Sequence, residues 1–235
     1  MRLKRLLYWT ASNWKNCGRT YCSSSAPNIT KVSLELGGKA PAIVMGDADL
    51  DLAVKAIRDS RIINTGQVCN CAERVYVHDS VADQFIEKVC NAMEHTRSGN
   101  PMEAGVEMGP LVNEAQRSRV EAAVAKATAE GAEVLLGGER GDRAKGYFYQ
   151  PTVLRGCRQE MSIMRQETFG PVLPISTSSS LDEAIAKAND CELGLTSSIY
   201  TQNLDVAMRA ANELKFDETY VNRENFEAMQ DFHAG

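Results

Sequence analysis

The sequence predicts an α/β domain in which a layered, largely parallel sheet is flanked by helices. Segments with a strand pattern alternate with segments with a helix pattern along most of the 235 residues. Such alternation is typical of a parallel sheet, because each return to the same edge requires a crossover, usually a helix. The composition agrees, since 43% hydrophobic and 24% charged residues are ordinary values for a globular protein with a core.

Short apolar and β-branched runs, bounded by glycine, proline and polar residues, predict the strands. They are expected at 32–36, 41–45, 73–78, 132–136, 171–176, 196–200 and 218–222. The turn Gly37-Gly38 joins the first two, and glycine there would let the backbone approach other groups closely. Residues 139–150 are expected to form an exposed loop leading to 151–154.

Apolar residues at spacings of three and four predict the helices between these strands. They are expected from Asp49 toward Ile63, from Ser80 onward, and over 113–130, 180–189 and 204–214. The Ala-rich helix over 113–130 is followed by Gly131, which accepts the left-handed conformation common after helix ends. Ser180 and Glu183 form the capping-box pattern that opens the next helix.

Composition and charge exclude several classes of function. A net charge of −5 gives no electrostatic case for binding nucleic acid, and no long apolar run predicts a membrane span. Seven cysteines at irregular spacing, without a secretion signal, indicate a reducing cytoplasm rather than a disulfide framework. No paired Cys-x-x-Cys motifs indicate a metal site.

Residues 1–27 differ in composition from the rest of the chain. They contain both tryptophans and no acidic residue, the first acid being Glu35. We expect an atypical, poorly ordered segment, interpreted as a junction or a shifted reading frame. The Arg- and Ser-rich composition also suggests an organelle transit peptide, which is the less favoured interpretation.

Two short motifs contain the residues with the clearest chemical potential. Glu35 opens Glu-Leu-Gly-Gly-Lys-Ala-Pro, and Cys69 ends Gly-Gln-Val-Cys 34 positions later (69 − 35). A thiol after a Gly-containing turn, with a carboxylate beside a second Gly-rich turn, indicates covalent chemistry on a carbonyl followed by attack of an activated water. Taken alone, such a Cys is more commonly a packed core residue and such a Glu a surface residue.

Together with Glu-Thr-Phe-Gly-Pro at 167–171, these motifs resemble those of NAD(P)-dependent aldehyde dehydrogenases, in the family's order. The resemblance runs from about Asn28 to Gly235, and the stretches 159–164 and 222–229 are most similar to members that act on lactaldehyde or glycolaldehyde. It implies the catalytic-domain fold of that family over 38–235, truncated at its C-terminal end. Residues 28–37 would then be a remnant of a cofactor-binding domain.

The resemblance implies a role for each site residue. Cys69 would be the nucleophile that forms a thioester, and Glu35 the base that activates the deacylating water. Glu167 would bind the nicotinamide ribose with Phe169 beside the ring, and Gly37 would contribute to the same cofactor site. A polar residue and a core aromatic before a Gly-Pro turn is the alternative interpretation of Glu167 and Phe169.

Three further residues are candidates for binding the substrate. Asn70 follows the nucleophile, while Glu227 and His233 lie in the late loop that approaches the substrate in the family. Simple solvent exposure is the more common interpretation of a loop histidine.

The implied function is oxidation of a small 2-hydroxyaldehyde to the carboxylic acid, with NAD or NADP as cofactor. The implied partner is a small aldehyde substrate, and no nucleic acid or membrane is expected. The resemblance also implies that the full-length relatives are homo-oligomers. Two alternatives stay open, because most of the family's cofactor half is not matched here. The chain would then be an inactive fragment, or a cofactor-independent thioesterase or esterase.

Overall fold

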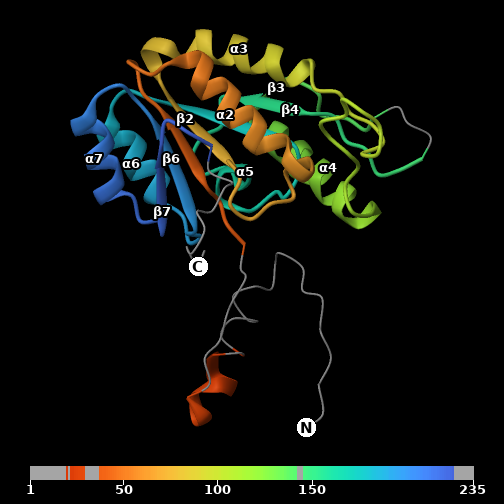
Figure 1. Ribbon diagram of the computed structural model, residues 1–235, viewed down its shortest axis with the longest axis horizontal. Coiled ribbons are helices and arrows are strands. Elements are labelled where there is room, and N and C mark those ends of the chain that lie inside the picture. The colour runs from red at the N-terminus through yellow and green to blue at the C-terminus, as the bar shows by residue number, and fades with distance from the viewer. Residues whose placement is uncertain (1–19, 21, 30–36, 142–144, 225–235) are drawn as a thin grey trace. The chain divides into compact units, whose positions relative to one another are not determined.

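The computed structural model describes residues 20, 22–29, 37–141 and 145–224 (Figure 1). The described residues 38–141 and 145–224 form one compact unit, and the fold below is that of this unit. Ahead of it, residues 22–25 are helical and are followed by a 3-10 turn, η2, at Ala26–Asn28. The predicted strand 32–36 and most of the atypical segment 1–27 lie outside the described residues.

A seven-stranded sheet forms the centre of the unit, in the order β3-β4-β5-β2-β1-β6-β7. All neighbouring strands are parallel except β3 and β4, which are antiparallel at one edge. The fold-class prediction is therefore confirmed. The strands are β1 (Pro41–Val44), β2 (Arg74–His78), β3 (Glu133–Leu136), β4 (Thr152–Arg155), β5 (Val172–Ser178), β6 (Thr196–Tyr200) and β7 (Glu218–Val221).

The helices begin and end close to where the sequence predicts them. Asp49, Asn113 and Ser180 each cap a helix by accepting backbone N–H groups of its first turn, which satisfies donors that have no partner within the helix. None of the helices in the described ranges is long and apolar enough to cross a membrane. They are α2 (Leu50–Ile62), α3 (Ala82–Glu94), α4 (Glu114–Ala129), α5 (Ser162–Arg165), α6 (Leu181–Asn189) and α7 (Leu204–Glu213), with 3-10 turns η3 (Ile63–Gly66) and η4 (Asp79–Val81).

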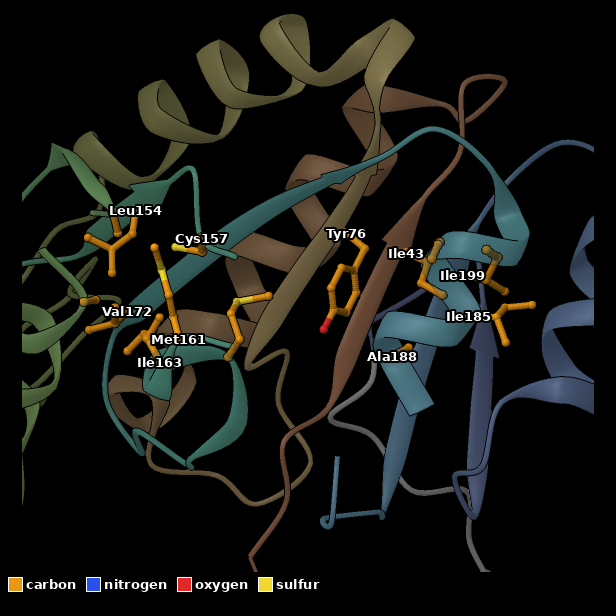
Figure 2. Packing of buried hydrophobic residues seen from close by; sticks show 14 of the residues in the cluster. Ile43, Tyr76, Leu154, Cys157, Met161, Ile163, Val172, Ile185, Ala188 and Ile199 are labelled. Atoms are coloured by element: carbon orange, nitrogen blue, oxygen red, sulfur yellow. The ribbon is translucent and has the colours of Figure 1, made fainter. Parts of the chain in front are cut away.

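Alternate residues of the strands build two separate cores, one on each face of the sheet. Val44, Val75 and Val77 pack with apolar residues of α2 and α3, which lie side by side over one face (Figure 1). On the other face, Ile43 and Ile199 of the sheet lie near α6, as Figure 2 shows. A sheet buried on both faces explains why β1 is apolar at every position rather than at alternate positions.

The segment 139–150 is exposed at residues 139–140 and 145–147, as predicted, but not near its end. Phe148 and Tyr149 are buried, and isolated bridges pair Arg140 with Tyr149 and Leu111 with Tyr147. Gly146 lies so close to the Phe148 ring that a Cβ there would meet it at 2.6 Å. Two aromatic side chains near the end of the loop are therefore buried, and the polar and Gly-rich composition did not predict this part. The short helix α5 was also not predicted.

The parallel register places four chain segments at one edge of the sheet. Pro41 pairs with Arg74, Val75 with Ile175, and the neighbouring β6 is in parallel register with β1. The residues just before β1, β2, β5 and β6 must therefore lie side by side. In many open α/β sheets ligands bind beyond the carboxyl ends of the strands, whereas here the motif residues gather at the amino ends.

Candidate active site

The described parts of the three sequence motifs, including Gly38, meet at this amino edge of the sheet. A Cβ added to Gly38 would lie 2.4 Å from the carbonyl oxygen of Cys69, so only glycine permits this approach. The Gly38 N–H also donates a hydrogen bond of 3.0 Å to Oε1 of Glu167. Gly38 therefore contacts both the nucleophile segment and the segment before β5.

The turn before Cys69 has an unusual backbone. Asn64, Thr65 and Gly66 have consecutive φ values of 46°, 61° and 72°, all in the left-handed region. This conformation is unfavourable for a β-branched residue, and it persists only where the surroundings hold it. The Thr65 hydroxyl donates to the Gly109 carbonyl at 3.0 Å, and a Cβ on Gly66 would lie 2.4 Å from the Gly170 carbonyl oxygen. The turn is thus packed against the third motif.

Cys69 and Cys71 occupy different environments. Cys69 is half-buried, whereas Cys71 is fully buried and its thiol donates to the Val68 carbonyl at 2.9 Å. Burial raises the pKa of the Cys71 thiol to about 11. Cys71 is therefore a poor nucleophile and contributes to packing.

Behind the turn lies a cluster of buried charges that sequence reasoning missed. The Glu73 carboxylate forms ion pairs with Lys39 at 2.7 Å and with Arg61 at 2.9 Å, and all three side chains are at most 1% exposed. Burial alone would raise the pKa of Glu73, but the charges of Lys39 and Arg61 hold it below its ordinary value. Glu73 is therefore ionised.

The two buried arginines tie this cluster to the backbone. Arg61 donates to the carbonyls of Gly66 at 2.5 Å and Ala72 at 2.8 Å, which lie on either side of Cys69. Arg74 donates to the carbonyls of Lys39 at 2.9 Å and Ala188 at 2.7 Å. Arg61 thus connects both ends of the nucleophile segment to Glu73.

The sequence contains only weak indications of this buried charged cluster. Lys39 belongs to the first motif, and Glu73-Arg74 places two charges at the start of an apolar strand. Arg61 lies in the last turn of α2, where an arginine ordinarily complements the helix dipole and needs no buried partner. Pattern alone does not pair these residues with one another.

The third motif is held in place from two sides. Glu73 accepts hydrogen bonds of 3.1 Å from the N–H groups of both Thr168 and Phe169. The Gln116 amide donates to the carbonyls of the same two residues at 3.1 and 2.8 Å. Phe169 has a left-handed φ of 52°, so this segment is a second strained backbone at the site.

Glu167 has a perturbed carboxyl group. Burial, followed by the charge of Glu73, raises its pKa to about 7, although the Gly38 N–H opposes the shift. Its Oε2 has no hydrogen-bond partner in the described part of the chain. A half-buried carboxyl group with an open acceptor oxygen fits the ribose end of a nicotinamide cofactor, and the half-buried Phe169 is close to it in sequence.

The other predicted site residues are only partly placed. Asn70 is 9% exposed, its Oδ1 is buried without a partner among the described residues, and its carbonyl accepts from Thr196 at 2.8 Å. Gly37 is partly exposed and lies directly before Gly38. The base candidate Glu35 and the substrate candidates Glu227 and His233 lie outside the described residues. The roles of all of these stay predictions.

The fold and the convergence of the motifs agree with what the comparisons show. Residues 9–235 match the family model described as "Aldehyde dehydrogenase family". The chain therefore belongs to the aldehyde dehydrogenase family, an oxidoreductase family acting on aldehydes. The match begins ahead of Asn28, where the motif-based resemblance starts.

Among individual proteins, the chain is 61% identical to the lactaldehyde dehydrogenase of Escherichia coli (strain K12) over 94% of its length. It is 45% identical over 93% of its length to the 3,6-anhydro-alpha-L-galactose dehydrogenase of Vibrio sp. (strain EJY3). In each case it covers 46% of the relative, so the chain spans about half the length of the curated relatives it matches.

The chain is also similar to solved structures of aldehyde dehydrogenases. The crystal structure of the Escherichia coli lactaldehyde dehydrogenase superposes with a TM-score of 0.88 over 93% of this chain and 46% of that one. A betaine aldehyde dehydrogenase from Staphylococcus aureus in complex with NAD+ is 34% identical, with a TM-score of 0.85 over 91% of this chain and 43% of that one.

Proposed function

We propose that this protein oxidises a small 2-hydroxyaldehyde, such as lactaldehyde or glycolaldehyde, to the carboxylic acid with NAD or NADP. The observation that most supports this proposal is the close approach of Gly38 to Cys69, which brings the first two motifs together. The 61% identity to a lactaldehyde dehydrogenase supports the substrate class. A relative solved with NAD+ supports the cofactor class.

Cys69 is the proposed nucleophile. Its thiolate adds to the aldehyde carbon and forms a thiohemiacetal, whose oxyanion is stabilised by backbone N–H groups. Bound NAD(P) supplies the hydride acceptor. Loss of hydride from the thiohemiacetal carbon leaves a thioester on Cys69.

Glu35 is the proposed base for the second half of the reaction. It removes a proton from a water molecule, which attacks the thioester carbonyl and releases the acid and the Cys69 thiolate. Glu167 would accept a hydrogen bond from the nicotinamide ribose through its open Oε2, and Phe169 would lie beside the ring. Gly37 is assigned to the same cofactor site.

Asn70, Glu227 and His233 are proposed to face the substrate. Its hydroxyl requires polar partners, and a buried amide oxygen without a partner, as at Asn70, is suited to accept from it. A reducing cytoplasm is the proposed compartment, because the reaction requires Cys69 as a thiolate.

The test is NADH formation by the purified protein with glycolaldehyde or lactaldehyde and NAD, and NADPH formation with NADP. We expect a product signal from wild type and from Cys71→Ser, in which the buried hydroxyl can still donate to the Val68 carbonyl. Cys69→Ser should give none. Equal rates from wild type and Cys69→Ser would sink the proposal.

A second candidate is cofactor-independent hydrolysis of esters or thioesters by Cys69 and Glu35. One observation favours it: hydrogen bonds within the described residues hold the turn before Cys69, from the Thr65 hydroxyl to the Gly109 carbonyl and from Arg61 to the Gly66 carbonyl. A nitrophenyl ester assayed without cofactor separates the candidates. Hydrolysis by wild type but not by Cys69→Ser, with no NADH from aldehyde, would favour the second.

A further inference from the structure

We propose that Glu73 is a positioning residue that holds the cofactor-facing segment Glu167–Phe169 against the segment that contains Cys69. The inference rests on the proposed function for what those two segments do. It adds a residue to which neither the motifs nor the proposed reaction assigns a role.

The geometry around the Glu73 carboxylate supports this assignment. Oε2 receives the Lys39 ammonium at 2.7 Å and the Thr168 N–H at 3.1 Å. Oε1 receives the Arg61 guanidinium at 2.9 Å and the Phe169 N–H at 3.1 Å. Each oxygen therefore joins one cation on the Cys69 side of the site to one backbone amide of the third motif.

The cations in turn are connected to the nucleophile segment, Arg61 directly and Lys39 through its neighbour Gly38. Arg61 holds the carbonyls of Gly66 and Ala72, and Lys39 follows Gly38, the residue that contacts Cys69. A connected series of contacts thus runs from the Cys69 segment through Arg61 and Glu73 to Phe169. Removal of Glu73 would break this series at its centre.

The held segment cannot be expected to keep its shape unaided. Phe169 adopts a left-handed φ of 52°, which a large side chain rarely adopts without support. Gln116 holds the carbonyls of Thr168 and Phe169, but only Glu73 receives their N–H groups in the described structure. Without Glu73, these two peptides lose half of their hydrogen bonds.

Glu73 could have a simpler role than positioning, namely to neutralise the buried cations Lys39 and Arg61. Two substitutions distinguish these two roles. Glu73→Asp keeps the negative charge and shortens the reach toward Thr168 and Phe169. Glu73→Gln keeps the length but loses the charge, and its amide places a donor where the carboxylate has only acceptors.

For both variants we expect faster hydrogen exchange at the Thr168 and Phe169 amides, by about tenfold, as for the loss of one hydrogen bond. The KM for NAD should rise by a similar factor of about ten, because Glu167 and Phe169 are no longer aligned. Alkylation of Cys69 by iodoacetamide should stay within about twofold in Glu73→Asp, since Arg61 keeps a charged partner.

Asn189→Ala is the matched control. Asn189 also holds backbone on two sides, donating to the Glu213 carbonyl and accepting from the Lys215 N–H, both at 2.8 Å, outside the site. Its loss should leave the KM for NAD and the exchange at residues 168 and 169 unchanged.

Two results would overturn the proposal. One is unchanged exchange at residues 168 and 169 in both Glu73 variants. The other is a Glu73→Asp variant with the wild-type amide exchange and KM for NAD, together with a Glu73→Gln variant that differs only in a lower melting temperature. Glu73 would then serve only to neutralise the charges of Lys39 and Arg61. If wild type itself forms no NADH, the proposed function fails, and amide exchange with Cys69 alkylation still decides the positioning role.

Discussion

The Gly38 N–H donates a 3.0 Å hydrogen bond to Oε1 of Glu167, a residue 129 positions away in sequence. On its other side, Gly38 approaches the Cys69 carbonyl so closely that no side chain fits between them. One glycine therefore sets the distance between the nucleophile segment and the carboxyl group proposed for cofactor binding. This contact makes the site sensitive to substitutions that leave every proposed catalytic side chain in place.

Gly38→Ala should disable the site without removing a reactive group. The new Cβ would lie 2.4 Å from the Cys69 carbonyl oxygen, and the segment must shift to relieve this overlap. A displacement of about 1 Å at a reacting group costs on the order of a hundredfold in rate. NADH formation should fall accordingly in a steady-state assay. Gly194→Ala, where a Cβ meets nothing within 4 Å, is the control and should retain activity.

Arg61→Met should destabilise the protein by about 3–5 kcal/mol, because it leaves Glu73 and two carbonyls buried with fewer partners. Lys55→Met removes an exposed ion pair, in which Lys55 is 80% exposed, and should cost less than about 0.5 kcal/mol. Urea unfolding followed by circular dichroism measures both. Equal losses in the two variants would contradict the importance of the buried cluster.

Glu167 should make stability depend on pH. Its pKa is raised from 4.5 to about 7, first by burial and then by the charge of Glu73, so the native state retains a proton that the unfolded chain releases. The stabilisation is therefore complete below pH 4.5 and is lost as the pH rises to about 7. Glu167→Gln does not titrate, and its urea midpoint should vary less across this range. A profile identical to wild type would show that another group titrates there.

Alkylation should distinguish the two neighbouring thiols. Burial raises the pKa of Cys71 to about 11, while Cys69 is half-buried at the end of its turn. Iodoacetamide under native conditions should therefore label Cys69 well before Cys71, as peptide mass spectrometry would show. Faster labelling of Cys71 would mean that the segment opens more readily than its hydrogen bonds indicate.

Local patterns were sufficient to predict most elements of the fold. The helix opening at Asp49 and the one ending before Gly131 are encoded by neighbouring residues, through caps and apolar spacing. The Gly-containing turn at Cys69 is equally local. The burial of Tyr149 was not predicted, because this residue packs in a core cluster with Leu111 and Val120, which are distant in sequence.

The sequence by itself determined the family, the alternation of strands and helices, and the identity of the motif residues Cys69, Gly38 and Glu167. Only the tertiary structure decided the strand order and the gathering of these residues at the amino edge of the sheet. It also decided the pairing of Glu73 with Lys39 and with Phe169, which lies 96 positions away. A buried charge is tolerated only with partners, and partners that distant become visible only when the chain is folded.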